Sequence, residues 1–182
     1  LRNSNWHMDG ADIDKIVNSQ YPDLDDDEMD ALKKKAGSLY TFMMNPERLE
    51  SVAADIAEHY TGHVEPNGYK AQAVCFTREA CVIIKEHLDK LLGPDKSAIV
   101  FTGAQNDSDR LRKFHTTEEE RKQIVKTFKD TESPLKILIV QSMLLTGFDA
   151  PICQVMYLDR KLIDHSLLQA IARVNRTKKD KQ

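Results

Sequence analysis

The sequence predicts an α/β fold, a doubly wound parallel sheet with helices on both faces. Its candidate strands are short and apolar at consecutive positions, which is typical of strands that helices cover on both sides. Segments with a helical spacing of apolar residues separate these strands, and this alternation is typical of parallel βαβ units. No internal repeat or low-complexity tract competes with this pattern.

The region before the sheet is expected to be partly helical. Residues 1–44 have weak periodicity and many acidic residues, and we expect a connector with a short helix around Met29–Ser38. Asn45 and Pro46 then supply a cap and a first-turn proline for a helix that Thr61-Gly62 ends. The predicted domains are therefore a connector, or the tail of a preceding lobe, over 1–44 and an α/β domain over 45–182.

Strands and helices alternate after this first helix. The expected strands are Ala73–Phe76, Ala98–Phe101, Ile137–Val140 and Gln154–Leu158, and the expected helices are Arg78–Leu92, Glu118–Lys129 and His165–Asn175. The side chains expected to be buried by the first two of these helices are Ala80, Ile84, Leu88, Leu91, Ile124, Val125 and Phe128. Right-handed crossovers would give a RecA-like layer, in which ligands bind at the carboxyl ends of the strands.

The composition excludes a membrane-spanning protein. Hydrophobic residues make up 41% and charged residues 30% of the chain, and no apolar run approaches the length of about 20 residues that spans a bilayer. The first residues contain no apolar core of a signal peptide. Because no methionine begins the sequence, we expect a fragment of a longer protein.

The cysteines and histidines do not predict a metal site. Cys75, Cys81 and Cys153 lack metal-ligand spacing and are expected to be buried free thiols, which suits a reducing cytoplasm. The six histidines are scattered. His115 and His165 lie near the motifs described below, where we expect them to serve surface or packing roles.

Charge is distributed unevenly along the chain, although the net charge is only -3. Residues 1–30 carry nine acidic and two basic side chains, whereas residues 160–182 carry two acidic and seven basic ones. This asymmetry is compatible with a chain that contacts phosphates through one face, and equally with an ordinary solvated basic tail.

The loop after the third expected strand combines a glycine with a nearby acid. Gly147 can take backbone conformations closed to other residues and allows close approach of a ligand. Asp149, between that glycine and Pro151, is a fixed acceptor suited to a hydroxyl group or a cation. A tight loop with an Asp-capped turn is the structural alternative.

The last expected helix places two arginines on one face. Gln169 and Arg173 are four residues apart and Arg173 and Arg176 are three apart, so all three share a stripe. The helix has no acid after Asp164, and planar guanidinium groups match the phosphates of an external anion. A basic surface helix without a ligand is the alternative.

Together the two elements resemble motifs V and VI of superfamily 2 helicases and translocases. The stretches Met143–Pro151, Tyr157–Asp159 and Leu168–Arg176 resemble, more closely still, the restriction (R) subunit of type I restriction-modification enzymes. The resemblance covers about residues 46–178 and implies the C-terminal, second helicase lobe of a RecA-like motor. Ala172 stands where most other superfamily 2 members have a glycine.

The resemblance implies half of an ATP site. Asp149 would lie near the nucleotide ribose, Gly147 would also contact ATP, and Gln169 would orient or sense the nucleotide. Arg173 and Arg176 would reach the ATP phosphates, and one of them would act as an arginine finger. The sequence contains neither a glycine-rich phosphate loop with its lysine nor an acidic magnesium motif. ATP with magnesium would therefore be bound mainly by a first motor lobe outside this chain.

The resemblance also implies contacts with a nucleic-acid backbone at strand ends. Phe76-Thr77-Arg78 looks like motif IV, and Thr102-Gly103 matches a turn that approaches nucleic acid in this superfamily. The residues predicted to follow the backbone are Thr77, Arg78, Thr102, Gly103, Ser142 and Thr146. As a structural alternative, Thr77 and Thr102 would cap the helices or turns that follow them.

The expected function is ATP-driven translocation of double-stranded DNA by a larger protein, with this chain inactive alone. The family resemblance adds a separate nuclease domain and the modification and specificity subunits as partners. Two alternatives remain open: the second lobe of another superfamily 2 repair or remodelling enzyme, and a non-enzymatic α/β interaction domain. The acidic cluster Asp23–Glu28 is expected to be a solvated connector rather than a nuclease site.

Overall fold

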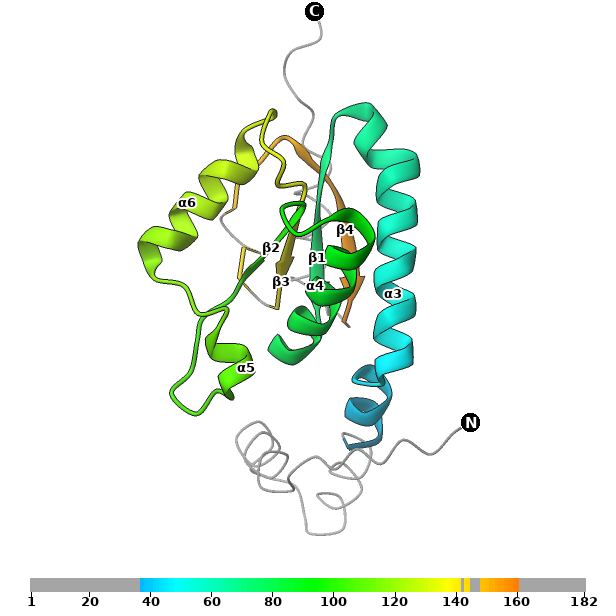
Figure 1. Ribbon diagram of the computed structural model, residues 1–182, viewed down its shortest axis with the longest axis vertical. Coiled ribbons are helices and arrows are strands. Elements are labelled where there is room, and N and C mark those ends of the chain that lie inside the picture. The colour runs from blue at the N-terminus through cyan, green and yellow to red at the C-terminus, as the bar shows by residue number, and fades with distance from the viewer. Residues whose placement is uncertain (1–36, 142, 145–147, 161–182) are drawn as a thin grey trace, which may run out of the picture. The chain divides into compact units, whose positions relative to one another are not determined.

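The computed structural model describes residues 37–141, 143–144 and 148–160 (Figure 1). The chain divides into two units, residues 1–49 and 50–182, and each is described by itself. The helix expected over His165–Asn175, and all but the end of the one around Met29–Ser38, lie outside the described residues. The domain boundary between residues 44 and 45 stays a prediction.

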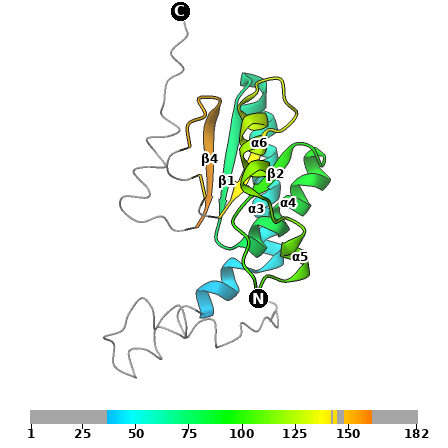
Figure 2. The ribbon, with the colours of Figure 1, turned by 90° about the vertical axis from the view of Figure 1, so that its left-hand side faces the viewer.

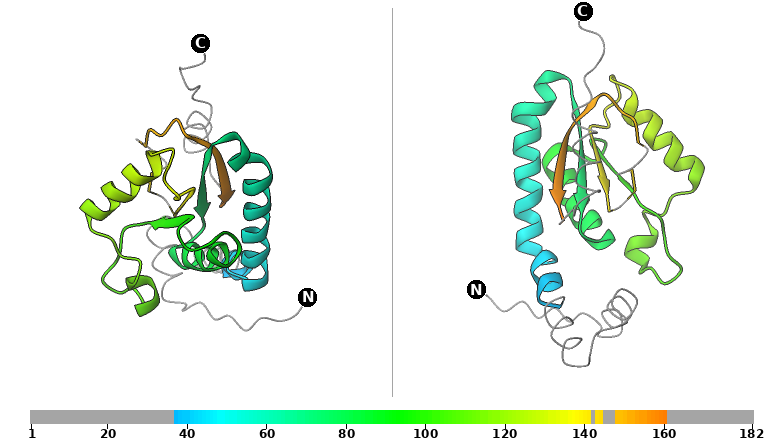
Figure 3. Two further views of the ribbon diagram at one scale, coloured as in Figure 1. Left: turned by 45° about the horizontal axis from the view of Figure 1, so that its top comes forward. Right: turned by 180° about the vertical axis from the view of Figure 1, so that it is seen from behind.

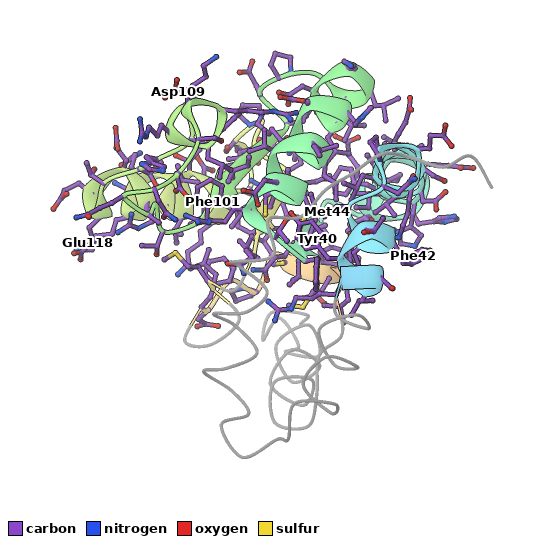
Figure 4. All side chains as sticks on the ribbon, turned by 90° about the horizontal axis from the view of Figure 1, so that it is seen from below. Tyr40, Phe42, Met44, Phe101, Asp109 and Glu118 are labelled. Atoms are coloured by element: carbon purple, nitrogen blue, oxygen red, sulfur yellow. The ribbon has the colours of Figure 1, made fainter. Side chains whose placement is uncertain are left out.

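The described part of the first unit is helical. A short helix covers residues 37–43, and α3 (Pro46–His59) begins in this unit and ends in the second. Asn45 caps α3 as predicted, because its Oδ1 accepts a hydrogen bond of 2.9 Å from the Arg48 N–H. The Arg48 guanidinium lies 5.2 Å from the centre of the Phe42 ring, which Figure 4 labels.

The second unit is built on a parallel sheet of four strands among the described residues. These are β1 (Lys70–Cys75), β2 (Ser97–Val100), β3 (Ile137–Val140) and β4 (Cys153–Asp159), in the order β2-β3-β1-β4. The register pairs Val140 with both Val100 and Val74, and Cys75 with Asp159. The carboxyl ends of all four strands therefore lie at one edge, where the loops that follow them come together.

Helices cover both faces of this sheet. The Ser97 hydroxyl donates to Asp89 of α4 (Arg78–Leu92) at 3.3 Å, which places α4 on the Ser97 face. Val100, three positions along β2, points to the opposite face and shares a buried cluster with Phe128 of α6 (Glu118–Lys129). Figures 2 and 3 show α4 running along the strands. The predicted doubly wound α/β fold is confirmed.

The bounds of several elements agree with the predictions. Helices α4 and α6 and strand β3 begin and end where the sequence predicts, while β2 and β4 differ by one residue at each end. A short helix, α5 (Asp109–Arg112), was not predicted, because four residues are too few to produce apolar periodicity. Strand β1 begins three residues earlier than predicted, at Lys70.

The predicted end of α3 is wrong. The α-helix ends at His59, but a π-helical turn over Tyr60–Val64 and a 3-10 turn over Glu65–Asn67 continue the helical path through Thr61-Gly62. Gly68 ends it instead, with φ +73, a backbone conformation that glycine adopts at little cost.

One predicted core residue is also misplaced. Leu91 is 54% exposed, because the buried face of α4 ends at Leu88, one turn earlier. In α6, Phe128 is fully buried, and Ile124 and Val125 pack against the same cluster while partly exposed.

Cys75, Cys81 and Cys153 are buried free thiols, as predicted. A hydrogen bond with Cys81, together with burial, raises the pKa of the Cys75 thiol. None of the helices in the described ranges is both long and apolar enough to cross a membrane.

Candidate functional site

The start of α4 forms one side of the candidate site, at the carboxyl end of β1. The Thr77 Oγ1 accepts a hydrogen bond of 3.0 Å from the Ala80 N–H and so caps the helix. This is the structural alternative that the sequence left open for Thr77. A contact between Thr77 and nucleic acid stays a prediction.

Arg78 is held by the loop that follows β2. Its Nη1 donates to Asp107 Oδ2 at 2.6 Å and to the Thr102 carbonyl at 3.3 Å. The guanidinium also lies 5.9 Å from the centre of the Phe101 ring. These contacts favour a positioning role for Arg78 over direct binding of a ligand.

Asp107 is the centre of this network. Its side chain is 2% exposed, and Oδ2 also accepts hydrogen bonds of 2.8 Å from the Ala104 N–H and from His115 Nε2. Burial alone would raise the pKa of Asp107. The hydrogen bonds from Ala104 and His115 and the charge of Arg78 outweigh burial and hold that pKa below its usual value. One carboxylate thus joins the start of α4 to the loop after β2 and to His115, eight residues further along the chain.

Gly103 is required by the close approach of a side chain. A β-carbon at this position would lie 2.6 Å from His115 Cε1 and 2.7 Å from both ring nitrogens. The His115 ring also meets Phe101 edge to face, with 6.5 Å between ring centres. The absence of a side chain at Gly103 therefore lets the imidazole lie directly against the loop backbone.

A cavity of about 550 Å³ opens beside this network. Its described lining consists of Thr102, Gly103, Ala104, Gln105, Arg112, His115, Thr116 and Arg121, which include two arginines and a histidine but no carboxylate. Figure 4 labels Phe101, which directly follows β2, and Asp109 and Glu118, which begin α5 and α6. The two guanidinium groups give the cavity a positively charged lining, which suits an anion.

Each of the two arginines of the cavity uses some of its N–H donors in hydrogen bonds within the chain. Arg112 donates to Asp109 at 3.2 Å and to the Gln105 carbonyl at 3.4 Å, and Arg121 donates to the Thr116 carbonyl. The Arg112–Asp109 pair is exposed, with 55% and 94% of the side chains accessible, so water screens it and it binds Arg112 weakly. A guanidinium has five N–H donors, and both groups keep donors for an anion.

A second cavity, of about 420 Å³, lies between α6 and the loop after β3. Its described lining is apolar at Val100, Val125, Met143, Leu144 and Phe148 and charged at Glu118, Arg121, Lys122, Lys129 and Asp149. Arg121 borders both cavities. The Thr102 hydroxyl donates to Met143 Sδ at 3.2 Å and so joins the loops after β2 and β3.

Comparison with known proteins identifies the family. Residues 84–182, more than half of the chain, match the family model of the type I restriction enzyme subunit R domain 3. The chain belongs to the type I restriction enzyme R subunit family. This confirms the resemblance that the motifs after β3 and β4 predicted.

Full-length relatives of this R subunit chain are much longer than it is. The type I restriction enzyme HindI endonuclease subunit of Haemophilus influenzae is 38% identical over 138 residues, which are 71% of this chain and 13% of that protein. A protein of Methanocaldococcus jannaschii named as the type I restriction enzyme MjaIXP endonuclease subunit is 37% identical over 160 residues, 86% of this chain and 15% of that protein. The R subunit chain thus spans under a fifth of these two relatives.

The described residues contain part of the predicted R subunit site. Thr102 and Gly103 line the first cavity, and Asp149 lines the second. Arg78 lines neither, but it donates hydrogen bonds to the Thr102 carbonyl and to Asp107. Six predicted residues lie outside the described ranges: Ser142, Thr146, Gly147, Gln169, Arg173 and Arg176. Within those ranges, no group of three or more His, Cys, Asp or Glu side chains is arranged to hold a metal ion.

Four residues of this site were not predicted: Asp107, Arg112, His115 and Arg121. The sequence predicts a surface or packing role for His115, and its contacts with Gly103 and Phe101 agree with packing. The available signal was the row of polar residues after β2, since the loop following a parallel strand reaches the edge where ligands bind.

Proposed function

We propose that this chain is the second motor lobe of an ATP-driven double-stranded DNA translocase, the R subunit of a type I restriction enzyme. The first motor lobe and a nuclease domain would lie on the same polypeptide, which would act with modification and specificity subunits. Family membership supports this proposal, as do the names of the relatives, which are endonuclease subunits.

The cationic cavity beside Thr102 and Gly103 is the observation that carries the DNA-binding part of the proposal. It lies where the carboxyl ends of the parallel strands meet, and its described lining brings Arg112 and Arg121 together without a carboxylate. Contacts of this type hold phosphates without reading base sequence, as a translocase requires.

In the proposed ATP site, this lobe contributes charged side chains, and the first lobe contributes the loop that binds the phosphates. Asp149 is exposed in the loop after β3, where a ribose hydroxyl could reach its carboxylate. Gly147 and Gln169 would complete the contacts with the nucleotide. Arg173 and Arg176 would stabilise the charge that develops on the transferred phosphoryl group, while magnesium would be held by the first lobe.

The arginine assignment is tested in the full-length polypeptide with its partner subunits. We expect the double variant Arg173→Ala/Arg176→Ala to lower the DNA-stimulated ATPase rate by roughly a thousandfold or more, the usual contribution of an arginine finger. Arg110→Ala is the matched control, because Arg110 pairs with Glu86 at 2.5 Å and lines neither described cavity. A double variant with the wild-type rate would refute the assignment.

A second test uses the 182-residue chain alone. We expect negligible ATP turnover, because the sequence has no phosphate-binding loop and half of the site is missing. Turnover comparable to that of the full-length polypeptide would contradict the two-lobe site.

A further inference from the structure

We propose that His115 is a phosphate ligand of the first cavity and that Asp107 is the residue that positions it. This inference rests on the proposed function, because the phosphate would belong to a DNA backbone. Neither residue was assigned a role by the motifs. The two side chains are joined by a hydrogen bond of 2.8 Å between His115 Nε2 and Asp107 Oδ2.

The hydrogen bond fixes which nitrogen of His115 can reach a ligand. Asp107 already accepts from Arg78 and Ala104, so its carboxylate is an acceptor and His115 Nε2 carries the hydrogen. His115 Nδ1 has no hydrogen-bond partner among the residues that the structure describes. The ring also lies against Gly103, where an added β-carbon would stand 2.6 Å from Cε1 and 2.7 Å from each nitrogen. The imidazole thus lines the cavity with one nitrogen committed and one available.

A bound anion would change the balance of charge around His115. Asp107 faces it from the loop after β2, and the compensating cation Arg78 approaches the same carboxylate oxygen from α4. On the cavity side the charged neighbours are Arg112 and Arg121, which by themselves oppose a third positive charge. A bound phosphate would neutralise these cations, and Nδ1 would then take up a proton and donate a hydrogen bond to a phosphate oxygen.

Packing alone is the competing explanation for His115. Its ring fills the space over Gly103 and meets Phe101, and a buried carboxylate often orients a histidine for structural reasons. The two explanations differ in what they predict for DNA binding. A packing role leaves binding independent of histidine protonation, whereas a phosphate ligand couples binding to pH and adds one contact to its salt dependence.

The test measures the affinity of the full-length polypeptide for a fluorescent double-stranded DNA of mixed sequence, at constant ionic strength. Between about pH 8 and about pH 5, where an imidazole gains its charge, we expect wild-type affinity to rise roughly tenfold, the low end for a hydrogen bond to a charged group. We expect His115→Gln to keep the weaker, high-pH affinity throughout. At the acid end its salt slope should also be smaller by about 1.

Two further variants separate positioning from folding. Asp107→Asn removes the carboxylate oxygen that holds His115 Nε2, so the variant should lose part of the affinity that the wild type gains in acid, and part of the salt slope. His63→Gln is the control, because His63 is an exposed histidine before β1 that lines neither described cavity, and it should keep the wild-type profile. Thermal unfolding of each variant identifies any that fails to fold, and His115→Gln, which keeps a hydrogen-bond donor for Asp107, is the variant expected to retain the fold.

The outcomes distinguish this inference from the proposed function. If the wild type binds no DNA at any pH, the proposed function itself fails. If it binds DNA but His115→Gln has the same pH profile and salt slope, only the assignment of His115 is wrong. If His115→Gln loses both while Asp107→Asn behaves as the wild type, His115 is a ligand that Asp107 does not position.

Discussion

The ring of His115 lies so close to the backbone of Gly103 that a β-carbon there would stand 2.6 Å from Cε1, inside van der Waals contact. The ring cannot simply rotate away, because Asp107 holds its Nε2 at 2.8 Å. A turn without a side chain and an oriented imidazole are therefore parts of one arrangement. A side chain at position 103 would therefore displace the ring of His115.

Gly103→Ala should lower the free energy of unfolding of this chain by about 1–3 kcal/mol, as overpacking usually does. His115→Ala removes the clash, so the double variant should be more stable than the sum of the single effects predicts, by at least about 0.5 kcal/mol. Urea unfolding measures these values. Gly62→Ala is the control, because no atom lies within 4 Å of its added β-carbon. Purely additive effects would contradict the contact.

Asp107→Asn should destabilise the chain by about 2 kcal/mol near neutral pH. Removing one member of a buried ion pair usually costs about 3–5 kcal/mol, but Arg78 and His115 are 25% and 33% exposed, and water partly compensates them. Thermal and urea unfolding measure the loss. Ser108→Ala, a neighbouring change that removes only a helix cap, should cost about 1 kcal/mol and serves as the comparison.

The same variant tests the lowered pKa of Asp107. A carboxyl group whose folded-state pKa lies below its unfolded value of about 3.9 stabilises the fold above that value, and this contribution is lost as pH falls through the folded-state pKa. The stability difference between wild type and Asp107→Asn should therefore be present above about pH 4 and shrink below it. A difference that grows in acid would contradict the assignment.

The sequence predicted the fold well where local signals were strong. Helix α4 begins shortly after β1 and stops before Gly93-Pro94, and the capping box of Thr117 and Glu120 marks the start of α6. The sequence predicts a shorter β1 because Lys70 and Gln72 are polar, and polar residues at alternate positions do not suggest a strand buried on both faces.

The candidate site was harder to predict than the fold. Thr102 and Gly103 were found because they directly follow a strand, but Asp107, His115 and Arg121 come from separate segments. Their meeting depends on how the chain returns between β2 and β3, and no spacing in the sequence encodes it. Residue types alone therefore indicated a backbone turn, while the structure adds the charged groups around it.

Lys70, the first residue of β1, should make stability rise with pH in mildly alkaline solution. Burial, followed by the nearby charge of Lys136, lowers the pKa of Lys70 to about 8, although its Nζ donates to the Asp130 carbonyl at 2.5 Å. Between about pH 8 and pH 10 the unfolded chain binds a proton that the folded chain lacks, so the free energy of unfolding increases. Lys70→Met should abolish this rise, whereas Met at the exposed Lys126 should not.

Gln72, in the centre of the same strand, is a position where we expect an apolar substitution to stabilise the fold. Its side chain is fully buried, neither amide atom has a hydrogen-bond partner among the residues described, and its register neighbours are Leu138 and Met156. An unsatisfied buried polar group costs about 1–3 kcal/mol, so Gln72→Leu should raise the free energy of unfolding by about 1 kcal/mol or more. The same change at the exposed Gln123 should alter it by less than about 0.5 kcal/mol. If Gln72→Leu instead lowered the free energy of unfolding, the amide would have a hydrogen-bond partner elsewhere in the chain. Gln72 would then contribute to stability rather than reduce it.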